Sequence, residues 1–262
     1  MMEVSLKLLT KVISFLFGAI ANVKRPKSLV QLLINLFIKQ YKIDISKAKK
    51  KSFFSLNDMF TRELEKDFSA FKNESFIHPV EGELVSSGPI EDGQIYLIKG
   101  KKYSLKDLIG EEFCEELGDK FNEKGSSLNA GYFYNYYLSP QDYHRVHHPV
   151  SGVYKSCTDI KGALYPVAPW FVKLCPSVFK KNYRTVSKVE SDAYGTVYTV
   201  MVGALNVGSI RMPQGLFANA EVSVKVGDHL GTFELGSSVV VICSKKIETP
   251  SPSRVFFDEF IP

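Results

Sequence analysis

The stretch GTFELGSSVV, residues 231–240, places a Gly-Ser step immediately before a run of β-branched residues. An apolar β-branched run that follows a turn residue predicts a buried strand. In most proteins a step such as Gly236–Ser237 is only the turn into that strand. The step also has chemical potential, because glycine has no side chain to block attack on its carbonyl. A serine hydroxyl just after it can attack that carbonyl once a base removes the proton.

The chain between residue 78 and this stretch has the same succession of β-rich runs and turn residues. Short β-rich runs alternate with glycine and proline, which is typical of a sheet-rich body with short connections. Residues 105–109 and 111–120 are short helical candidates within it. With the α-helical arm described next, the pattern predicts an α+β fold with a barrel-like or sandwich-like β-rich body. The predicted strands are residues 83–86, 94–98, 150–158, 196–202, 209–211, 223–226 and 238–242.

The N-terminal part reads as a helical arm. Residues 4–22 and 27–41 are predicted helices, and Pro26 stands where the second one begins, so the two form a hairpin. Polar residues recur every four positions in the second helix and share one stripe, so its other faces are apolar. Those faces either pack on the domain or a partner subunit, or insert into a membrane interface, and the pattern favours neither. We expect a hairpin unit at residues 1–45 and a β-rich domain at residues 46–262.

The charge is concentrated in the same arm. Residues 1–51 contain 11 Lys or Arg and two acids, a local charge of +9, and the remainder contains 33 − 11 = 22 basic and 28 − 2 = 26 acidic residues. A basic, apolar segment suits an anionic lipid surface. No nucleic-acid recognition motif accompanies it, and the acidic remainder argues against nucleic acid. The apolar run at residues 12–21 is too short to span a bilayer.

A histidine cluster is the second chemically notable segment. Residues 143–152 read YHRVHHPVSG, so three of the five histidines in the chain fall within five residues. Histidine exchanges protons near neutral pH, which favours an acid–base site. A metal site and a structural polar cluster remain alternatives from the residues alone, although the spacing matches no known zinc motif and we expect no metal. The four cysteines show no CxxC pair and are expected to be free thiols.

A third segment, HPVEGE at residues 78–83, places a carboxylate before a glycine. At a tight bend such a carboxylate can orient a histidine, as the acid of a Ser–His–acid set does. In most proteins a sequence of this kind is simply a turn.

Together these segments resemble the phosphatidylserine decarboxylase family over nearly the whole chain. The similar segments occur in the family's order, and the YHRVH core combined with the LGSS step is the most specific part. The segments are FTREL at 60–64, PVEGEL at 79–84, IKGKKYSLKDLIG at 98–110, YYLSPQDYHRVHHPVSG at 136–152, VGALNVGSI at 202–210 and GTFELGSSVV at 231–240.

The resemblance implies a role for each matching residue. Ser237 matches the serine that cleaves the chain after Gly236 and becomes a covalent pyruvoyl cofactor, which forms a Schiff base with the substrate. His147 matches the base for this cleavage, and His144 matches the histidine implicated in decarboxylation. Glu81 stands where the family usually has Asp and is expected to orient His147, with one methylene more to accommodate. Residues 182–184 also depart from the family's usual Asn-Glu-Arg, with tyrosine in the middle.

The implied activity is decarboxylation of phosphatidylserine to phosphatidylethanolamine, a step of phospholipid biosynthesis. The products of self-cleavage would be a β chain, residues 1–236, and an α chain, residues 237–262, which stay associated. The resemblance further implies a homodimer of processed units and a peripheral protein on the cytoplasmic face of a bacterial cell membrane. Three rivals remain: a pyruvoyl decarboxylase for a soluble amino acid or another lipid, a non-enzymatic barrel-like carrier, and a zinc hydrolase.

Overall fold

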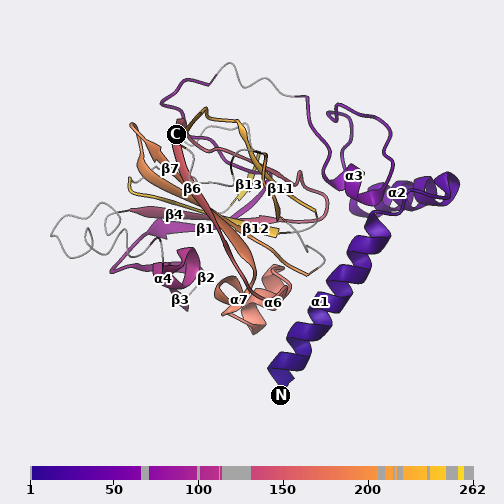
Figure 1. Ribbon diagram of the computed structural model, residues 1–262, viewed down its shortest axis with the longest axis horizontal. Coiled ribbons are helices and arrows are strands. Elements are labelled where there is room, and N and C mark those ends of the chain that lie inside the picture. The colour runs from indigo at the N-terminus through magenta and orange to yellow at the C-terminus, as the bar shows by residue number, and fades with distance from the viewer. Residues whose placement is uncertain are drawn as a thin grey trace.

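The computed structural model describes residues 2–65, 71–98, 101–111, 113, 131–205, 210–214, 216, 221–234, 237–245 and 253–256. It has an α+β architecture in which a β-rich body follows an N-terminal helical arm (Figure 1). The helices are α1 Met2–Ala21, α2 Lys27–Tyr41, α3 Leu56–Phe60, α4 Leu105–Ile109, α6 Pro169–Leu174 and α7 Val178–Lys181. The strands are β1 Gly82–Pro89, β2 Gln94–Ile98, β3 Lys101–Ser104, β4 Tyr132–Leu138, β5 Arg145–His147, β6 Gly152–Ile160, β7 Arg184–Ser191, β8 Gly195–Val202, β9 Ile210–Arg211, β10 Val222–Val224, β11 His229–Phe233, β12 Ser237–Cys243 and β13 Ser253–Val255.

The body is built on an eight-stranded antiparallel sheet with the order β10-β6-β7-β8-β12-β4-β1-β13. Strand β12 lies near its centre, paired with β4 on one side and β8 on the other. All seven of its residues are buried, which explains why its sequence is an almost unbroken apolar run rather than an alternating one. The predicted β-rich, sandwich-like body is therefore confirmed, with open sheets in place of a closed barrel.

Two smaller sheets complete the body. Strands β5, β11 and β9 form one, and β2 and β3 form the other. The first carries the histidine segment, because β5 is its Arg145–His147 portion and pairs with β11. The register of that pairing shifts by one residue between His229 and Gly231, where two steps along β11 oppose one step along β5. This small sheet thus fixes the histidine segment beside the chain that leads into β12.

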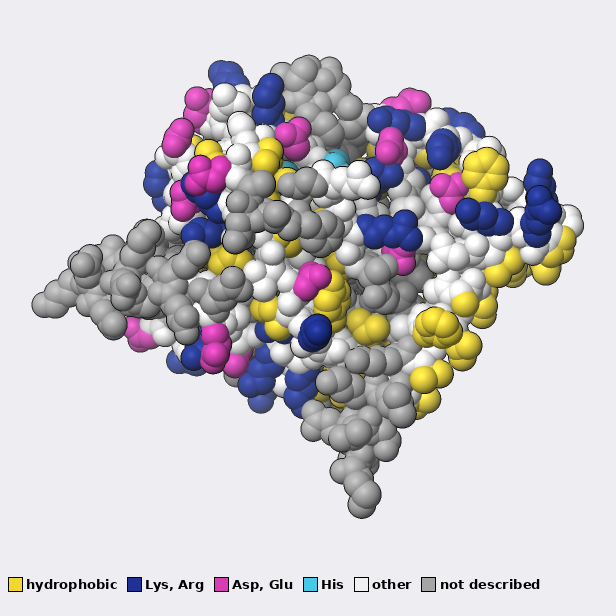
Figure 2. Space-filling view, viewed as in Figure 1, with side chains coloured by type: hydrophobic (Ala, Val, Ile, Leu, Met, Phe, Trp, Pro, Cys, Tyr) yellow, Lys and Arg dark blue, Asp and Glu magenta, His cyan; other side chains and the backbone are white. Residues whose placement is uncertain are grey.

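The arm consists of two helices, as predicted. Helix α2 has the predicted bounds, and α1 covers the expected segment with slightly earlier ends. Val30 and Ile34 of α2 are buried, whereas a broad set of apolar side chains remains exposed on both helices. Figure 2 shows these hydrophobic side chains gathered along the edge of the molecule that α1 and α2 form. They are Leu9, Val12, Ile13, Phe15, Leu16, Ile20, Leu29, Leu32, Leu33 and Leu36.

Several elements were not predicted from the sequence. Strand β4, YFYNYYL, is rich in residues that suit strands, but its almost continuous aromatic run does not alternate. Five of its seven residues are buried because it lies between β12 and β1. Strands β3, β5, β7, β11 and β13 and the short helices α6 and α7 were also missed. The candidate helix at residues 111–120 lies largely outside the described residues.

The segment after α7 begins with the buried Asn182 and the half-buried Tyr183. Asn182 donates to the carbonyls of Tyr165 and Gly203 at 2.8 Å each and accepts from the Tyr165 amide at 3.0 Å. It therefore ties the loop before α6 to the end of β8. The Tyr183 hydroxyl lies 3.4 Å from the Thr185 hydroxyl. The departure at Tyr183 is thus accommodated at a half-buried position next to these anchors.

Candidate active site

Two antiparallel segments bring the predicted catalytic residues into one region. Leu138, at the end of β4, pairs with Ser237, the first residue of β12. Six residues further along, the carbonyl of His144 accepts a hydrogen bond from the amide of Phe233 at 2.9 Å. Residues 138–144 and 233–237 are therefore joined at both ends, and the histidine segment runs beside the turn that precedes Ser237. Leu235 and Gly236, the other side of the predicted cleavage bond, lie outside the described residues.

Ser237 is fully buried at the entrance to the central strand. Its Oγ has no hydrogen-bond partner among the described residues. A buried hydroxyl without a partner costs free energy, so such a group in a native fold calls for an explanation. A hydroxyl that is to act as a nucleophile is one such explanation, because it has to be available to the atom that it attacks.

His147 is held in one tautomer. Its Nδ1 lies 2.7 Å from the carbonyl oxygen of Gly227, so Nδ1 carries the proton and donates it. The opposite nitrogen, Nε2, lies 3.1 Å from the hydroxyl of Tyr143, which donates to its lone pair. Gly227 has a φ of +86°, a conformation that favours glycine and sets the direction of its carbonyl. Nε2 is therefore the basic nitrogen of this imidazole.

His144 is more deeply buried than His147. It is fully buried, and neither ring nitrogen makes a well-formed hydrogen bond within the described part of the chain. Its ring meets the ring of Phe60 edge-on at 5.7 Å between centroids. Burial, with a smaller contribution from the charge of Arg62, lowers the pKa of His144 to about 3. His144 is consequently neutral in this environment.

Glu81 contacts a cation from the opposite end of the chain. Its Oε1 lies 3.0 Å from Nη2 of Arg254, which also contacts the buried carboxylate of Asp142 at 2.5 Å. The turn that carries Glu81 requires a glycine next, because a Cβ on Gly82 would lie 2.5 Å from the carbonyl oxygen of Tyr137. A carbonyl oxygen thus accepts from Nδ1 of His147, and the carboxylate of Glu81 pairs with Arg254. The predicted orienting role of Glu81 remains a prediction.

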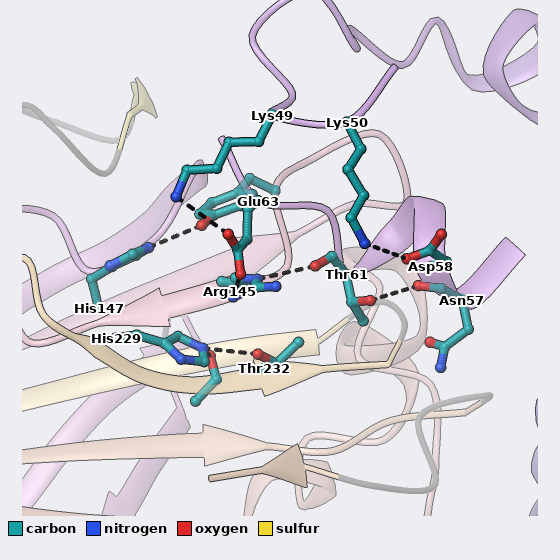
Figure 3. Close-up of polar contacts among 12 residues, drawn as sticks. Lys49, Lys50, Asn57, Asp58, Thr61, Glu63, Arg145, His147, His229 and Thr232 are labelled. Carbon is teal, nitrogen blue, oxygen red and sulfur yellow. Dashed lines mark hydrogen bonds and ion pairs between the residues drawn. The ribbon is translucent and has the colours of Figure 1, made fainter. Parts of the chain in front are cut away.

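Figure 3 shows how the segment after α3 is fastened to the histidine strand. Arg145 forms an ion pair with Glu63 at 2.9 Å and donates to the carbonyl of Thr61 at 3.0 Å. Glu63 also pairs with Lys49 at 3.3 Å, so the segment between α2 and α3 joins the same network. In the same view Nε2 of His229 shares a hydrogen bond of 2.8 Å with the hydroxyl of Thr232. The segment that connects the arm to the body is therefore attached to β5, the strand that ends in His147.

His78 and His148 are buried as well. His78 shares a hydrogen bond of 3.0 Å with the Tyr136 hydroxyl, and burial lowers its pKa to about 4. Burial, then the neighbouring His147 and His229, lowers the pKa of His148 to about 3. Within the ranges that the structure describes, no three His, Cys, Asp or Glu side chains are grouped to hold a metal ion.

An apolar cavity of about 230 Å³ lies between the arm and the body. Phe17, Phe37 and Phe60 wall it from the arm, and Leu138 and Pro140 wall it from the segment that leads to the histidines. Leu138 is the pairing partner of Ser237, and Phe60 contacts His144. The cavity therefore lies next to Ser237 and His144, two of the residues with predicted catalytic roles.

Sequence reasoning missed the residues that support these groups. Tyr143 and Gly227 hold His147, while the buried carboxylate of Asp142 pairs with the exposed Arg254 beside Glu81. Tyr143 and Asp142 lie inside the quoted histidine segment, so the local signal was present. Gly227 and Arg254 had no local signal. Gly227 reaches the site through its hydrogen bond to His148, and Arg254 reaches it through the pairing of β13 with β1, and both partners are distant in sequence.

Comparison with known proteins settles the family. Residues 56–255 match the family described as phosphatidylserine decarboxylase. The chain belongs to the phosphatidylserine decarboxylase family. It is 32% identical over 240 residues to the phosphatidylserine decarboxylase proenzyme of Shewanella putrefaciens, covering 83% of this chain and 80% of that protein. It is 33% identical over 252 residues to the proenzyme of Vibrio parahaemolyticus, with 88% and 85% covered, and 34% identical over 252 residues to that of Shewanella denitrificans, with 88% and 83% covered.

The match to the phosphatidylserine decarboxylase family includes the candidate catalytic residues. Glu81, the histidine segment, Ser237 and Arg254 all fall within residues 56–255. The arm helices α1 and α2 lie before this range. The family-wide part of the protein is thus the body with α3, and the resemblance inferred from the motifs is confirmed.

The buried neutral histidines predict that acid destabilises the fold. His148 has a pKa of about 3 in the folded protein and 6.5 ordinarily. Below pH 6.5 the unfolded chain therefore binds a proton that the folded state does not. The free energy of unfolding should fall as pH falls, by up to about 1.4 kcal/mol per pH unit for each such histidine.

Replacing His148→Leu removes one of these titrating groups. We expect a flatter dependence of the thermal midpoint on pH than in the wild type between about pH 6.5 and pH 4.5. Differential scanning calorimetry at several pH values measures both slopes. Identical slopes would mean that His148 is protonated in the folded protein as readily as in the unfolded chain.

Proposed function

We propose that this protein is a self-processing, pyruvoyl-dependent decarboxylase that converts phosphatidylserine to phosphatidylethanolamine. The observation that carries the proposal is the placement of Ser237. Its hydroxyl is buried and unpartnered within the described residues, at the first position of the central strand. Residues 138–144, which lead into the histidine segment, are joined to residues 233–237 at both ends. The proenzyme names of the relatives support the same activity.

The maturation step follows from the nucleophile and the base. Nε2 of His147 takes the proton of Ser237, and Oγ attacks the carbonyl carbon of Gly236. The peptide C–N bond breaks, the amine of residue 237 is released, and an ester joins residue 236 to the serine oxygen. Loss of the α proton of residue 237 then expels the carboxylate of residue 236 and leaves dehydroalanine. Water adds, ammonia leaves, and a pyruvoyl group remains at position 237.

The base assignment is consistent with the hydrogen bonds of His147. Its Nδ1 proton is engaged by the Gly227 carbonyl, so Nε2 is the nitrogen with a lone pair. The Tyr143 hydroxyl occupies that lone pair in this state at 3.1 Å and has to yield it when the base acts. Glu81 is proposed to stabilise the imidazolium that forms, through a carboxylate that Arg254 holds at the edge of the site.

The surroundings of residue 237 fit the group that it is proposed to become. A pyruvoyl group is small, uncharged and carries no hydrogen-bond donor, so a buried position beside apolar neighbours suits it. It would supply an electron sink for the electron pair that remains when carbon dioxide leaves. His144 is the proposed acid that returns a proton to the α carbon, since it lies beside the apolar cavity and contacts Phe60.

The arm supports a lipid substrate. Its exposed apolar side chains and basic residues suit the interface of an anionic membrane, where a headgroup can be reached without crossing. No helix in the described part of the chain is both long enough and apolar enough to cross a membrane. We place the protein peripherally on the cytoplasmic face of a bacterial cell membrane. The family resemblance also supports a homodimer of processed units.

Cleavage predicts two chains in the purified protein. The intact protein is 29.5 kDa, and cleavage gives residues 1–236 and a fragment of 262 − 237 + 1 = 26 residues. The small fragment should be one ammonia lighter than the same peptide beginning with serine. Intact mass spectrometry tests this directly, with Ser237→Ala as the uncut control. Two chains from the alanine variant would overturn the assignment of the nucleophile.

Replacing His147 and replacing His144 should impair different steps. A His147→Ala protein should remain uncut, because the proposed base is missing. A His144→Ala protein should be cut normally yet decarboxylate phosphatidylserine about 10²–10⁴-fold more slowly. Cleavage is followed by mass and decarboxylation by release of carbon dioxide. Unchanged turnover in the His144→Ala protein would remove this residue from the mechanism.

Membrane binding should depend on the exposed face of α2 and not on its buried face. Replacing Leu32 and Leu36, both more than half exposed, with glutamine should abolish co-flotation with phosphatidylserine vesicles and leave the thermal midpoint unchanged. Ile34→Gln on the buried face is the matched control and should lower the midpoint instead. Full vesicle binding by the Leu32, Leu36 double variant would place the membrane contact elsewhere.

A further inference from the structure

Arg62 is a buried cation that lacks acceptors. It follows α3 and is only 4% exposed. Its Nη2 lies 3.4 Å from the carbonyl of Gln141, a long contact, and Nε and Nη1 have no hydrogen-bond partner within the described residues. Keeping a guanidinium from water in this way is unfavourable unless something else solvates it.

Arg184 shows how the same protein treats a structural arginine. It is equally buried, at 4% exposed, but all its nitrogens donate to backbone carbonyls. The acceptors are Leu108 at 2.7 Å, Lys180 at 3.1 Å, Asn182 at 3.0 Å and Asp107 at 2.6 Å. Arg184 fastens α4 and α7 to the start of β7. Arg62 has no comparable set of hydrogen-bond acceptors, so a purely structural role does not explain why it is buried.

Arg62 lines a polar cavity of about 290 Å³ with an excess of positive charge. Lys42, Lys47 and Arg254 line it as well, against the carboxylates of Asp44 and Glu81, which gives 4 − 2 = +2. Glu81 is paired with Arg254, and Asp44 accepts a hydrogen bond from the Ser46 amide at 2.8 Å. The guanidinium of Arg62 and the two lysines therefore face the cavity without a described ion-pair partner.

This polar cavity and the apolar cavity are walled by the same two segments. Phe60 lines the apolar one and Arg62 the polar one. On the facing segment, Leu138 and Pro140 line the apolar cavity and Gln141 the polar one. An apolar space next to a cationic one matches a molecule with hydrocarbon at one end and an oxyanion at the other.

We infer that Arg62, with Lys42 and Lys47, forms a binding site for a phosphate-type oxyanion, and that its occupant is the phosphodiester of a phospholipid. The planar fork of a guanidinium matches the oxygens of a phosphate group, and the lysines add charge without fixing geometry. The lipid occupant rests on the proposed function, whereas oxyanion binding at Arg62 does not. Arg62 is on this view a specificity residue that positions the headgroup near His144.

The first test compares two buried arginines in the full-length protein without added anion. Arg62→Met removes a charge that lacks acceptors and should leave the thermal midpoint unchanged or raise it. Arg184→Met removes a set of charge-assisted hydrogen bonds and should lower the midpoint by roughly 5–10 °C. A similar loss from both variants would make Arg62 structural and overturn the inference.

The second test measures ligand binding and needs no turnover. Inorganic phosphate and submicellar dihexanoyl phosphatidylserine are titrated against the full-length protein at constant ionic strength, with calorimetry as the readout. Arg62→Met should weaken binding of the lipid by about tenfold or more, and Lys47→Gln should weaken it less. Lys161→Gln, an exposed lysine outside this cavity, is the matched control and should bind as the wild type does.

The outcomes separate the sources of the phosphate. Loss of lipid binding in Arg62→Met supports the inference, with or without detectable binding of inorganic phosphate. Loss of phosphate binding alone would show a site for free phosphate and overturn the lipid assignment. Binding of both probes independently of Arg62 would overturn the site itself. The intact mass of the same samples shows whether the chain has cleaved itself. A failure of the proposed self-processing is therefore distinguished from a failure of ligand binding at Arg62.

Discussion

The pairing of β12 on both sides is the constraint on which the rest of the structure depends. The strand begins at Ser237 and is held by β4 and β8 along its length, with every side chain buried. A chain cut just before such a strand would not lose it, because the hydrogen bonds and buried apolar surface remain. The new terminus would stay at the position of the serine. Strand β13, paired with β1 and fastened by Arg254, adds a second attachment for the same fragment.

Burial also sets the electrostatics of the site. Removing an imidazole from water disfavours its charged form, and this is the largest cause of the lowered pKa values of His78, His144 and His148. The tyrosine beside His147 is affected in the opposite direction, since burial raises the pKa of Tyr143. Every one of these groups is thereby kept neutral. A dry, neutral site suits chemistry in which charge appears only as bonds break.

Local pattern allowed the prediction of elements whose sequence signal lies within the element. The bounds of α2 and of β2 follow from the spacing of their apolar and polar residues and from the turn residues that flank them. The valine run predicted β12. The resemblance supplied the catalytic candidates because their motifs are contiguous. What could not be predicted depends on partners far away in sequence, such as Gly227 on His147 or Arg254 on Glu81, 173 residues apart. Arg62 stands inside a quoted motif, but only burial shows that its guanidinium lacks acceptors.

The same electrostatics would link substrate binding to the proposed acid step. His144 is held neutral first by burial and then by the positive charge of Arg62, so it is not a cationic acid before substrate binds. Phosphatidylserine brings a carboxylate and a phosphate, and negative charge near an imidazole raises its pKa. A phosphate on Arg62 would cancel the cation that disfavours protonation, and a carboxylate near residue 237 would add to the effect. The substrate would thus create the acidity that its own decarboxylation requires, while His144 stays uncharged in the empty site.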